Sequence, residues 1–552
     1  MNSRSSQHPA VAILQQDLLH GKITRREFLR MATLLGTAFP TALALAGCGL
    51  TEGTLPTLPT TPPTPEPVTR GGTLTIGSDV LLESSDPAQL SWGHSANQVR
   101  QIGEYLTLTD ADNITHPWLL ESWETSADVK VWTLRLRRGI TFNNGDELDA
   151  DDVIFSLNHW LNPATGSSMR DLLAFLQPHN IERVDNHTIR LYLDTPQIGL
   201  PEYLFHYPAV VLHRGFEGDF IGSPVGTGPF MLAEYEPGEH IIFNRRFGYW
   251  RIGADGATLP YLDRIVYRNL TPDERVEAMQ AGLIDTLYRP RTEDWQKLQT
   301  VPGVVVSTVS TAQALVIRMR VDRPPWNDVR VRNAFKFCQD RQRILDVSFY
   351  GQGDLAIDAH VAPVHPAYCE KPIPQYDPAR SRALLREAGY PEGLNVTLTT
   401  KNDYSEPEVA NTLRMLAAEG GFIIDVNIVE PARYWEQWRE VDLGITAWEH
   451  RPLDTMVLAL GYVADAQGQP TSWNETHWVD QEFIDLVRQA EGTFDVAQRR
   501  ALMCRIEDVM QERGPIGISY WRKMWAIANG RFKNLHAHPT TYDLLHEVWK
   551  QA

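Results

Sequence analysis

Residues 132–157 read WTLRLRRGITFNNGDELDADDVIFSL and combine a strand, a turn and the start of a helix. Polar and apolar side chains alternate over Trp132–Leu136, as expected for a strand with one buried face. The Asn-Asn-Gly-Asp run at residues 143–146 supplies a turn. Acidic residues from Asp149 onward begin a helix, because negative charge is favoured at a helix N-terminus. Apolar side chains then repeat at helical spacing, at Val153, Ile154, Leu157 and Trp160.

The same two patterns alternate through the rest of the chain. Strands are expected over residues 72–77, 187–193, 395–399 and 445–448, and helices over residues 272–279, 328–335 and 378–388. Interleaved strands and helices predict an α/β fold. The part from Gly71 to Ala552 has about 480 residues, more than one hydrophobic core usually supports, so two or three domains are expected.

The first 48 residues are typical of an export signal. A basic stretch, Thr24–Arg30, precedes an apolar stretch over residues 31–46, and Leu-Ala-Gly-Cys follows with its cysteine at Cys48. This order predicts a signal peptide over residues 1–47. The apolar stretch is shorter than the roughly 20 residues that span a membrane, so a transmembrane helix is the weaker interpretation.

Two details of this signal resemble known export motifs. The pair Arg25 and Arg26, followed by Glu-Phe-Leu, resembles the twin-arginine signal. Leu-Ala-Gly-Cys resembles the bacterial lipobox, in which Cys48 is acylated and becomes the mature N-terminus. An ordinary secretory signal with a chance cysteine is the alternative. More than one acyl chain on Cys48 would hold the protein on the outer face of the cell membrane, in a periplasm or at the cell surface.

A tether is expected over residues 48–70, which are rich in Thr and Pro from Thr51 onward. Proline without periodic apolar residues cannot build a core and favours an extended chain. Twenty such residues reach about 60 Å at ~3.1 Å each, enough to lift a folded body off a membrane.

The charge of the chain excludes one class of partner. The formal net charge is −18. Without residues 1–47, which carry five basic and two acidic side chains, the charge is −21. Nucleic-acid binding is not expected, because phosphates require clustered Lys and Arg.

Three cysteines lie beyond Cys48, at Cys338, Cys369 and Cys504, and no two are close enough in sequence for a zinc motif. The twin-arginine resemblance implies folding before export, in a reducing cytosol. Disulfides are then dispensable for folding, and three buried or half-buried thiols are expected.

Six segments resemble a known family, in the order in which the family carries them. They are LLESWE (119–124), LRLRRG (134–139), DDVIFSL (151–157), GTGPF (226–230), PYLD (260–263), and DVRVR with a later DR (328–332 and 340–341). Together they are similar to the peptide/nickel-type, or oligopeptide-binding, extracellular solute-binding proteins of ABC importers.

The resemblance implies a two-lobed α/β clamshell of the periplasmic-binding-protein type II, with an extra inserted domain. Carried over to this chain, lobe I would be residues 71–106, 216–322 and 524–552, the inserted domain 107–215, and lobe II 323–523. Closure of the hinge around the ligand is the expected motion.

The same resemblance implies a function. The chain would be the lipid-anchored substrate-binding component of an ABC importer that captures a peptide or related small organic solute and passes it to the membrane permease subunits. A monomer without a cofactor is expected. An oligosaccharide or an anionic solute is the alternative ligand, since aromatic faces suit sugar rings and the chain has 16 Trp.

The expected ligand loop follows the strand that ends at Trp448. Peptide-binding members of the family place an Asp three residues after this Trp, where it pairs with the peptide's ammonium group. Here that position is Arg451, which would repel an ammonium group at low dielectric. Arg451 either clamps an anion through its planar fork or points to solvent. Glu449 and Asp454 belong to the same predicted site, although Thr455 replaces the family's Pro after Asp454.

Other ligand-binding candidates rest on their place in the family pattern. They are Trp92 and His94 after the first strand, Met169 and Arg170 in a loop of the inserted domain, and Trp473 in a polar loop beyond Trp448. Surface or packing roles are the alternative for each of them.

Rival functions have weaker support. The chain has no H-E-x-x-H, no G-x-S-x-G and no phosphate-binding loop, so no enzyme motif is present. His536 and His538 resemble a metal-ligand pair, but alternation on a terminal strand would place both on a solvated face, so no metal site is expected. A metal-chelate binder or an adhesive lipoprotein remains a lesser alternative.

Overall fold

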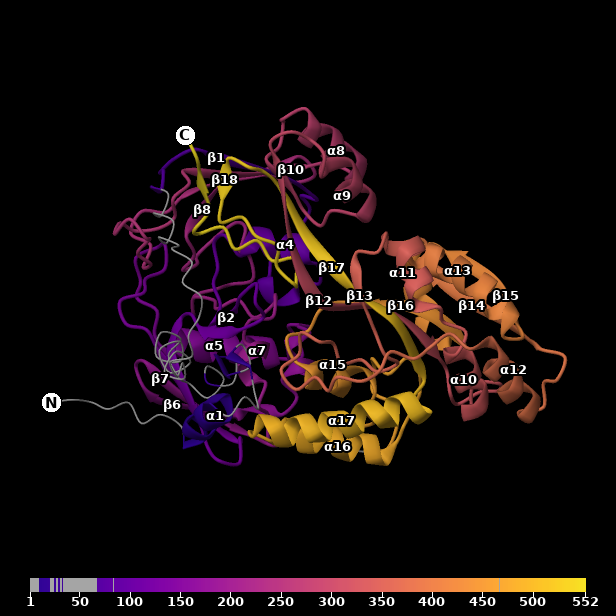
Figure 1. The fold of residues 1–552 in the computed structure, drawn as a ribbon. Helices are drawn as coiled ribbons and strands as arrows, with labels where there is room; N and C mark the ends of the chain where they lie inside the picture. Colours follow the sequence, from indigo (N-terminus) through magenta and orange to yellow (C-terminus); the bar gives the residue numbers. More distant parts are fainter. Residues whose placement is uncertain are drawn as a thin grey trace, which may run out of the picture. The chain divides into compact units, whose positions relative to one another are not determined.

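The computed structural model describes residues 9–19, 24, 25, 28, 29, 32, 67–82, 84–465 and 467–552. The chain divides into two units (Figure 1). Unit 1 comprises residues 1–308 and 525–552, and unit 2 comprises residues 309–524. The chain passes from unit 1 to unit 2 within β12 (Val304–Met319) and returns within β17 (Ile516–Asn529). The residue boundaries given above for the inserted domain and for the lobe segments stay a prediction.

The first sheet of unit 1 has a parallel centre and an antiparallel edge. Its order is β11 (Thr286–Leu287), β1 (Thr73–Ser78), β10 (Arg264–Asn269), β9 (His240–Arg245) and β8 (Phe230–Glu236). β1 runs parallel to β10 and β11, and β9 is antiparallel to both of its neighbours. The alternation of β1 buries Leu74 and Ile76. Flanking helices are α4 (Gly93–Val99), α8 (Pro272–Gln280) and α9 (Thr292–Leu298).

A second, antiparallel sheet of unit 1 contains the stretch quoted at the outset. Its order is β4 (Leu120–Thr125), β5 (Val131–Leu136), β7 (Thr188–Leu193) and β6 (Leu176–Asp185). The helix α5 (Ala150–Leu161) packs on β6 and β7 (Figure 1). Trp123, Trp132 and Trp160 are fully buried. The short elements β2 (Thr107–Thr109), β3 (Thr115–Pro117), α6 (Met169–Leu172) and α7 (Leu200–Tyr203) complete this region.

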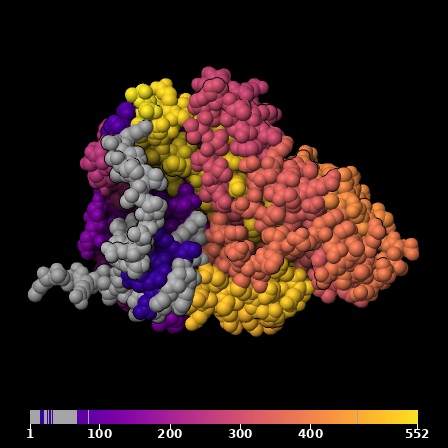
Figure 2. Space-filling model, in the orientation of Figure 1, coloured from indigo at the N-terminus to yellow at the C-terminus, as the bar shows by residue number. Residues whose placement is uncertain are grey.

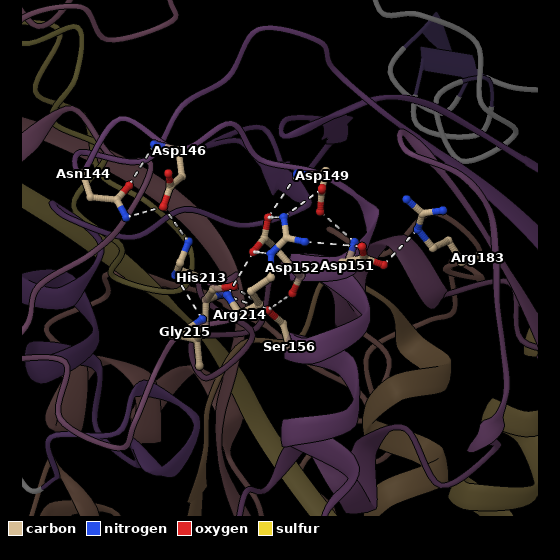
Figure 3. A network of polar contacts seen from close by, with 11 residues as sticks. Asn144, Asp146, Asp149, Asp151, Asp152, Ser156, Arg183, His213, Arg214 and Gly215 are labelled. Atoms are coloured by element: carbon tan, nitrogen blue, oxygen red, sulfur yellow. Dashed lines mark hydrogen bonds and ion pairs between the residues drawn. The ribbon is translucent and has the colours of Figure 1, made fainter.

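An arginine secures the start of α5 (Figure 3). Asp149 caps the helix by accepting the backbone N–H of Asp151 at 2.9 Å. The Arg214 guanidinium pairs with Asp149 at 2.7 Å and with Asp152 at 3.1 Å, and its backbone N–H donates to Asp152 at 2.9 Å. Asp152 is fully buried, so the Arg214 contacts supply the compensation that a buried carboxylate requires.

Unit 2 is built on β15 (Phe422–Val429), β14 (Leu394–Lys401), β16 (Leu443–Trp448), β12 and β17, with β13 (Gly353–Leu355) paired to β17. Its helices are α10 (Val329–Lys336), α11 (Arg341–Phe349), α12 (Pro378–Glu387), α13 (Glu406–Glu419), α14 (Pro431–Gln437), α15 (Asp454–Gly461), α16 (Gln481–Glu491) and α17 (Val496–Arg513). α16 and α17 pack side by side, and Figure 2 shows them as a continuous yellow band on the surface of this unit.

The predicted strands and helices are confirmed within a few residues, and they interleave as an α/β fold requires. One local prediction is wrong. Residues 534–547 form an irregular segment rather than a strand, and they do not place His536 and His538 on one solvated face. His536 is exposed, whereas His538 is buried and its Nε2 lies 2.9 Å from the Thr109 carbonyl oxygen.

The prediction of three free thiols is also wrong. Cys369 and Cys504 form a disulfide, with a Cα–Cα separation of 5.1 Å across 135 residues of sequence. The irregular segment that carries Cys369 packs on α17, where the Cys369 N–H donates to Glu507 at 3.1 Å. This packing brings the two cysteines together, and their spacing in the sequence does not indicate it. Cys338 is a buried free thiol, and burial raises its pKa to about 12.

Most of the export signal and the tether lie outside the described residues, including Arg26 and Cys48. Arg25 is described and exposed. A helix, α1, spans Pro9–Leu19. Within the described part of the chain, no helix is long and apolar enough to cross a membrane.

Candidate functional site

Unit 1 contains a pocket of about 440 Å³, within the size range of small-molecule sites. We call it the unit 1 pocket. It is lined by the β2–β3 hairpin with Trp118, by the end of β11 through Arg289, and by Trp525 and the 534–547 segment. These three segments are far apart in sequence. A smaller cavity of about 30 Å³, lined by Arg100 and Glu104 among others, shares Leu108, Trp118, Asp543, Leu544, Leu545 and His546 with it.

Aromatic rings form much of the wall of the unit 1 pocket: Trp118, Tyr288, Trp525 and Tyr542. Trp525 stacks on Trp295 of α9, with ring centroids 5.7 Å apart. Behind Tyr542 lies the guanidinium of Arg100, 3.9 Å from the ring centroid. Its nitrogen atoms have no hydrogen-bond partner among the described residues, so aromatic rings take the place of acceptors around this buried cation.

Charged side chains at the unit 1 pocket have partners within the protein. The Asp110 carboxylate lies 2.6 Å from His116 Nε2. Burial opposes ionisation of Asp110, but hydrogen bonds from His116 and from backbone N–H groups lower its pKa. Arg251 pairs with Glu547 at 3.2 Å and lies 3.1 Å from His546 Nε2. Burial and the Arg251 charge lower the pKa of His546 to about 3, so this imidazole is neutral and accepts the bond.

Three non-glycine residues that line the unit 1 pocket have left-handed backbone conformations. Arg289, Asn534 and Thr541 have φ angles of 49°, 61° and 58°. The conformation is most unfavourable for Thr541, because its side chain is β-branched. The Thr541 carbonyl accepts a bond of 2.8 Å from the side-chain amide of Asn97, which helps to hold it in place. Strained backbone of this kind concentrates at binding sites, which marks this pocket as the functional candidate in unit 1.

In unit 2, the predicted Trp448 is the last residue of β16 and is 7% exposed. Its Nε1–H donates to Glu475 Oε1 at 3.0 Å. Glu475 also pairs with the fully buried Arg318 at 3.1 Å. The Trp448 ring lies 6.1 Å from that of Trp473, which is 44% exposed. The structure therefore brings these two predicted residues together, one fixed in the core and one open to solvent.

Arg451 is half-buried, and it forms no ion pair among the described residues. Its Nε is buried without a partner, and Nη1 lies 3.5 Å from the His450 carbonyl oxygen. Asp454 begins α15 and is 2% exposed, with Oδ1 accepting the Thr455 N–H at 2.7 Å and Oδ2 without a partner. Glu449 is exposed and accepts a bond of 2.9 Å from the Tyr404 hydroxyl.

The remaining predicted residues lie in unit 1. Trp92 precedes α4 and is 56% exposed. His94 lies within α4, its ring 6.3 Å from that of Tyr288 in the unit 1 pocket wall. Met169 is fully buried, which favours its alternative role in packing, and Arg170 is exposed. A ligand role for each of these residues stays a prediction.

Sequence reasoning missed the residues that line the unit 1 pocket. Of these residues the sequence pattern singles out only the pair His536 and His538, which it predicts to be solvated. One signal was present in the sequence: residues 534–547, NLHAHPTTYDLLHE, contain three His and a Tyr without a helix or strand pattern. An irregular stretch with several polar and aromatic side chains is typical of a binding loop.

Comparison with known proteins identifies the family. Residues 115–469 match the model of the bacterial extracellular solute-binding proteins, family 5. Di/tripeptide-binding protein 1 of Pseudomonas aeruginosa is 27% identical over 444 residues, covering 72% of this chain and 79% of the relative. Heme-binding protein A of Haemophilus influenzae is 29% identical over 468 residues, covering 78% and 83%.

Solved structures show the same fold. The periplasmic binding protein DppA of Helicobacter pylori, in complex with the peptide STSA, matches 88% of this chain and 99% of its own with a TM-score of 0.74 at 22% identity. Clavulanic acid biosynthesis oligopeptide binding protein 2 matches 88% and 96%, with a TM-score of 0.77 at 22% identity. The predicted type II fold with an inserted domain is thereby confirmed. The chain belongs to the family 5 bacterial extracellular solute-binding proteins.

Proposed function

We propose that this protein is the lipid-anchored substrate-binding component of an ABC importer and that it captures a peptide or a related small organic solute. The family match over residues 115–469 carries the proposal. Curated relatives that bind di- and tripeptides support the peptide class. Closure of the two lobes around the solute, as the family fold implies, would precede delivery to the permease.

The unit 1 pocket supports this proposal on physical grounds. A volume of about 440 Å³ accommodates a small organic molecule. Aromatic walls provide apolar contact, and paired charges such as Arg251 and Glu547 hold the walls in place. Exclusion of water from such a site strengthens the few polar contacts that orient a solute.

A panel of defined probes tests solute capture. The purified mature chain is titrated with trialanine, N-acetyl-trialanine, maltotriose and citrate, and its thermal unfolding is recorded. A probe at 100 times its dissociation constant stabilises the folded state by about 2.7 kcal/mol, which is readily measured. Mass spectrometry of small molecules that co-purify with the protein extends the search. Binding of no organic solute in either experiment would refute the proposal.

An oligosaccharide is a second candidate for the solute, and a specific observation favours it. The Asp110–His116 and Arg251–Glu547 pairs leave the aromatic rings as the principal contacts of the unit 1 pocket, and such rings suit neutral sugars. Arg451 also stands where the family resemblance implies an Asp that pairs with a peptide's ammonium group. Stabilisation by maltotriose without stabilisation by trialanine would select this candidate, and the reverse result would select peptides.

The lipid anchor is a separate part of the proposal, with its own test. Intact-mass analysis of protein from a membrane fraction should show acylated Cys48 as the first residue. Cys48→Ser should release the folded protein into the soluble fraction while solute binding is retained. Recovery of the wild-type protein in the soluble fraction, with a first residue other than Cys48, would contradict the lipid anchor. That result would not bear on the proposal of solute capture.

A further inference from the structure

Glu104 is a buried acid that connects three aromatic side chains behind the unit 1 pocket. Its Oε1 accepts the Tyr249 hydroxyl at 2.5 Å and the Trp118 Nε1–H at 2.8 Å. Its Oε2 accepts the Trp250 Nε1–H at 3.0 Å. Glu104 is 5% exposed and lines the small adjoining cavity, but not the unit 1 pocket itself. The carboxylate therefore acts on the pocket only through the rings that it holds.

The chemistry of the donors makes these contacts restrictive. Trp118 and Trp250 are half-buried, and an indole N–H can donate but cannot accept, so each ring is held where its N–H meets the Glu104 acceptor. Burial raises the pKa of Glu104 above its ordinary value, and the bonds from Tyr249, Trp250 and Trp118 offset this rise only in part. Burial also raises the pKa of Tyr249 well above its ordinary value, so the phenol keeps its proton and remains a donor. Rotation of the Trp118 ring would break its bond to Glu104 and leave Oε1 with the Tyr249 hydroxyl alone, so one hydrogen bond to a buried acid would be lost.

Trp118 in turn supports the charged part of the pocket wall. The Arg251 guanidinium lies 4.3 Å from the Trp118 ring centroid, and the His546 ring centroid lies 5.0 Å from it. Arg251 then contacts both His546 and Glu547. Trp118, Arg251, His546 and Glu547 all line the unit 1 pocket. The orientation of one indole ring thus sets the position of a cation and two further side chains in the wall.

We propose that Glu104 is a positioning residue for solute binding: it fixes the Trp118 ring, and with it the Arg251 side of the unit 1 pocket. This inference rests on the proposed capture of a solute in that pocket. Glu104 does not touch the solute. Its replacement should therefore weaken binding through the mobility of Trp118, beyond any general loss of stability.

The test compares Glu104→Gln with a matched control, Asp152→Asn. Asp152 is also a fully buried carboxylate of unit 1, but it lies at the start of α5 and lines neither cavity. Both variants should lower the unfolding temperature. Only Glu104→Gln should weaken the affinity for whichever of trialanine, N-acetyl-trialanine, maltotriose or citrate binds, by roughly tenfold, as expected for the loss of one charge-assisted hydrogen bond.

A double variant separates positioning from a general effect. Trp118→Phe keeps an aromatic ring but removes the N–H donor to Glu104. If Glu104 acts through this bond, Glu104→Gln combined with Trp118→Phe should weaken binding no more than Trp118→Phe alone. Additive losses would overturn the inference. Should Glu104→Gln fail to fold, Glu104→Asp provides the same comparison, because it keeps the charge and withdraws the oxygen atoms from Trp118.

A readout without any solute makes the two proposals separable. In protein labelled with 5-fluorotryptophan, the ¹⁹F resonance of Trp118 is assigned by its disappearance in Trp118→Phe. It should shift or broaden in Glu104→Gln and stay unchanged in Asp152→Asn. An unchanged resonance in Glu104→Gln would overturn the inference even where a solute binds. A changed resonance together with no binding of any probe would instead count against the proposed function.

Discussion

At the scale of single residues, Arg451 sets the charge of the loop that is predicted to bind ligand in unit 2. Its buried Nε has no partner, and no acid among the described residues forms an ion pair with it. A guanidinium in this state can bind a carboxylate with little competition from the protein. The same group disfavours a free ammonium nearby, which argues against peptides with an unblocked N-terminus.

We therefore expect Arg451→Ala to abolish the binding of an anionic probe. Calorimetric titration with citrate should show measurable heat for the wild type and none for the variant. Arg433→Ala, an exposed arginine of α14, provides the control and should bind as the wild type does. Equal citrate affinity in wild type and Arg451→Ala would remove Arg451 from the ligand site.

At the scale of elements, the disulfide joins an irregular segment to α17. A crosslink that closes a long loop restricts the unfolded chain and typically stabilises a protein by about 2–4 kcal/mol. We expect the Cys369→Ser, Cys504→Ser double variant to fold and to lose roughly this free energy of unfolding in urea titration. Reducing agent should lower the stability of the wild type to a similar extent and leave the variant unaffected. A reductant-insensitive wild type would show that the disulfide does not form in solution.

The cap of α5 permits a second comparison at this scale. Asp149→Ala removes the side-chain acceptor for the Asp151 N–H and one partner of Arg214. The free energy of unfolding should therefore fall by about 1 kcal/mol. Ser168 stands at the equivalent position of α6 but makes no side-chain cap bond, so Ser168→Ala should change stability by less than about 0.5 kcal/mol. Equal effects in the two variants, measured by chemical denaturation, would contradict the capping role.

Elements with a strong local pattern were predictable from the sequence. Residues 132–157 form the expected strand, turn and helix, because alternation and an acidic first turn are local signals. The unit 1 pocket was not predictable, since it combines segments near residues 110, 288 and 540 whose contact depends on tertiary packing. His538 shows the same limit: its burial follows from a contact with Thr109, more than 400 residues away in sequence.

At the scale of the whole molecule, Glu507 contributes a pH dependence of stability near neutrality. Burial raises the pKa of this α17 carboxyl group to about 8. The pKa of Glu507 is therefore higher in the folded state than in the unfolded chain, so the folded state holds the proton more tightly. The contribution of the protonated Glu507 to stability is complete below the unfolded pKa and is lost as the pH rises through about 8. Between pH 6.5 and 8 the free energy of unfolding should fall by up to about 1.4 kcal/mol per pH unit.

Glu507→Gln should remove this slope, because an amide keeps an acceptor for the Cys369 N–H but does not ionise. Urea denaturation at several values between pH 6.5 and 8 measures it. Glu512→Gln, an exposed acid of the same helix, should retain the wild-type slope. If the slope persists in Glu507→Gln, another group must bind the extra proton in the folded state.

The path of the chain through the two units has a consequence for synthesis. Unit 2 interrupts unit 1, so Trp525 and the 534–547 segment leave the ribosome only after all of residues 309–524. Until then β11 lacks its partner Ala528 in β17, and the unit 1 pocket lacks one wall. Ribosome-bound chains that stop before residue 525 should therefore be unable to retain a solute in this pocket, however well their earlier segments have folded.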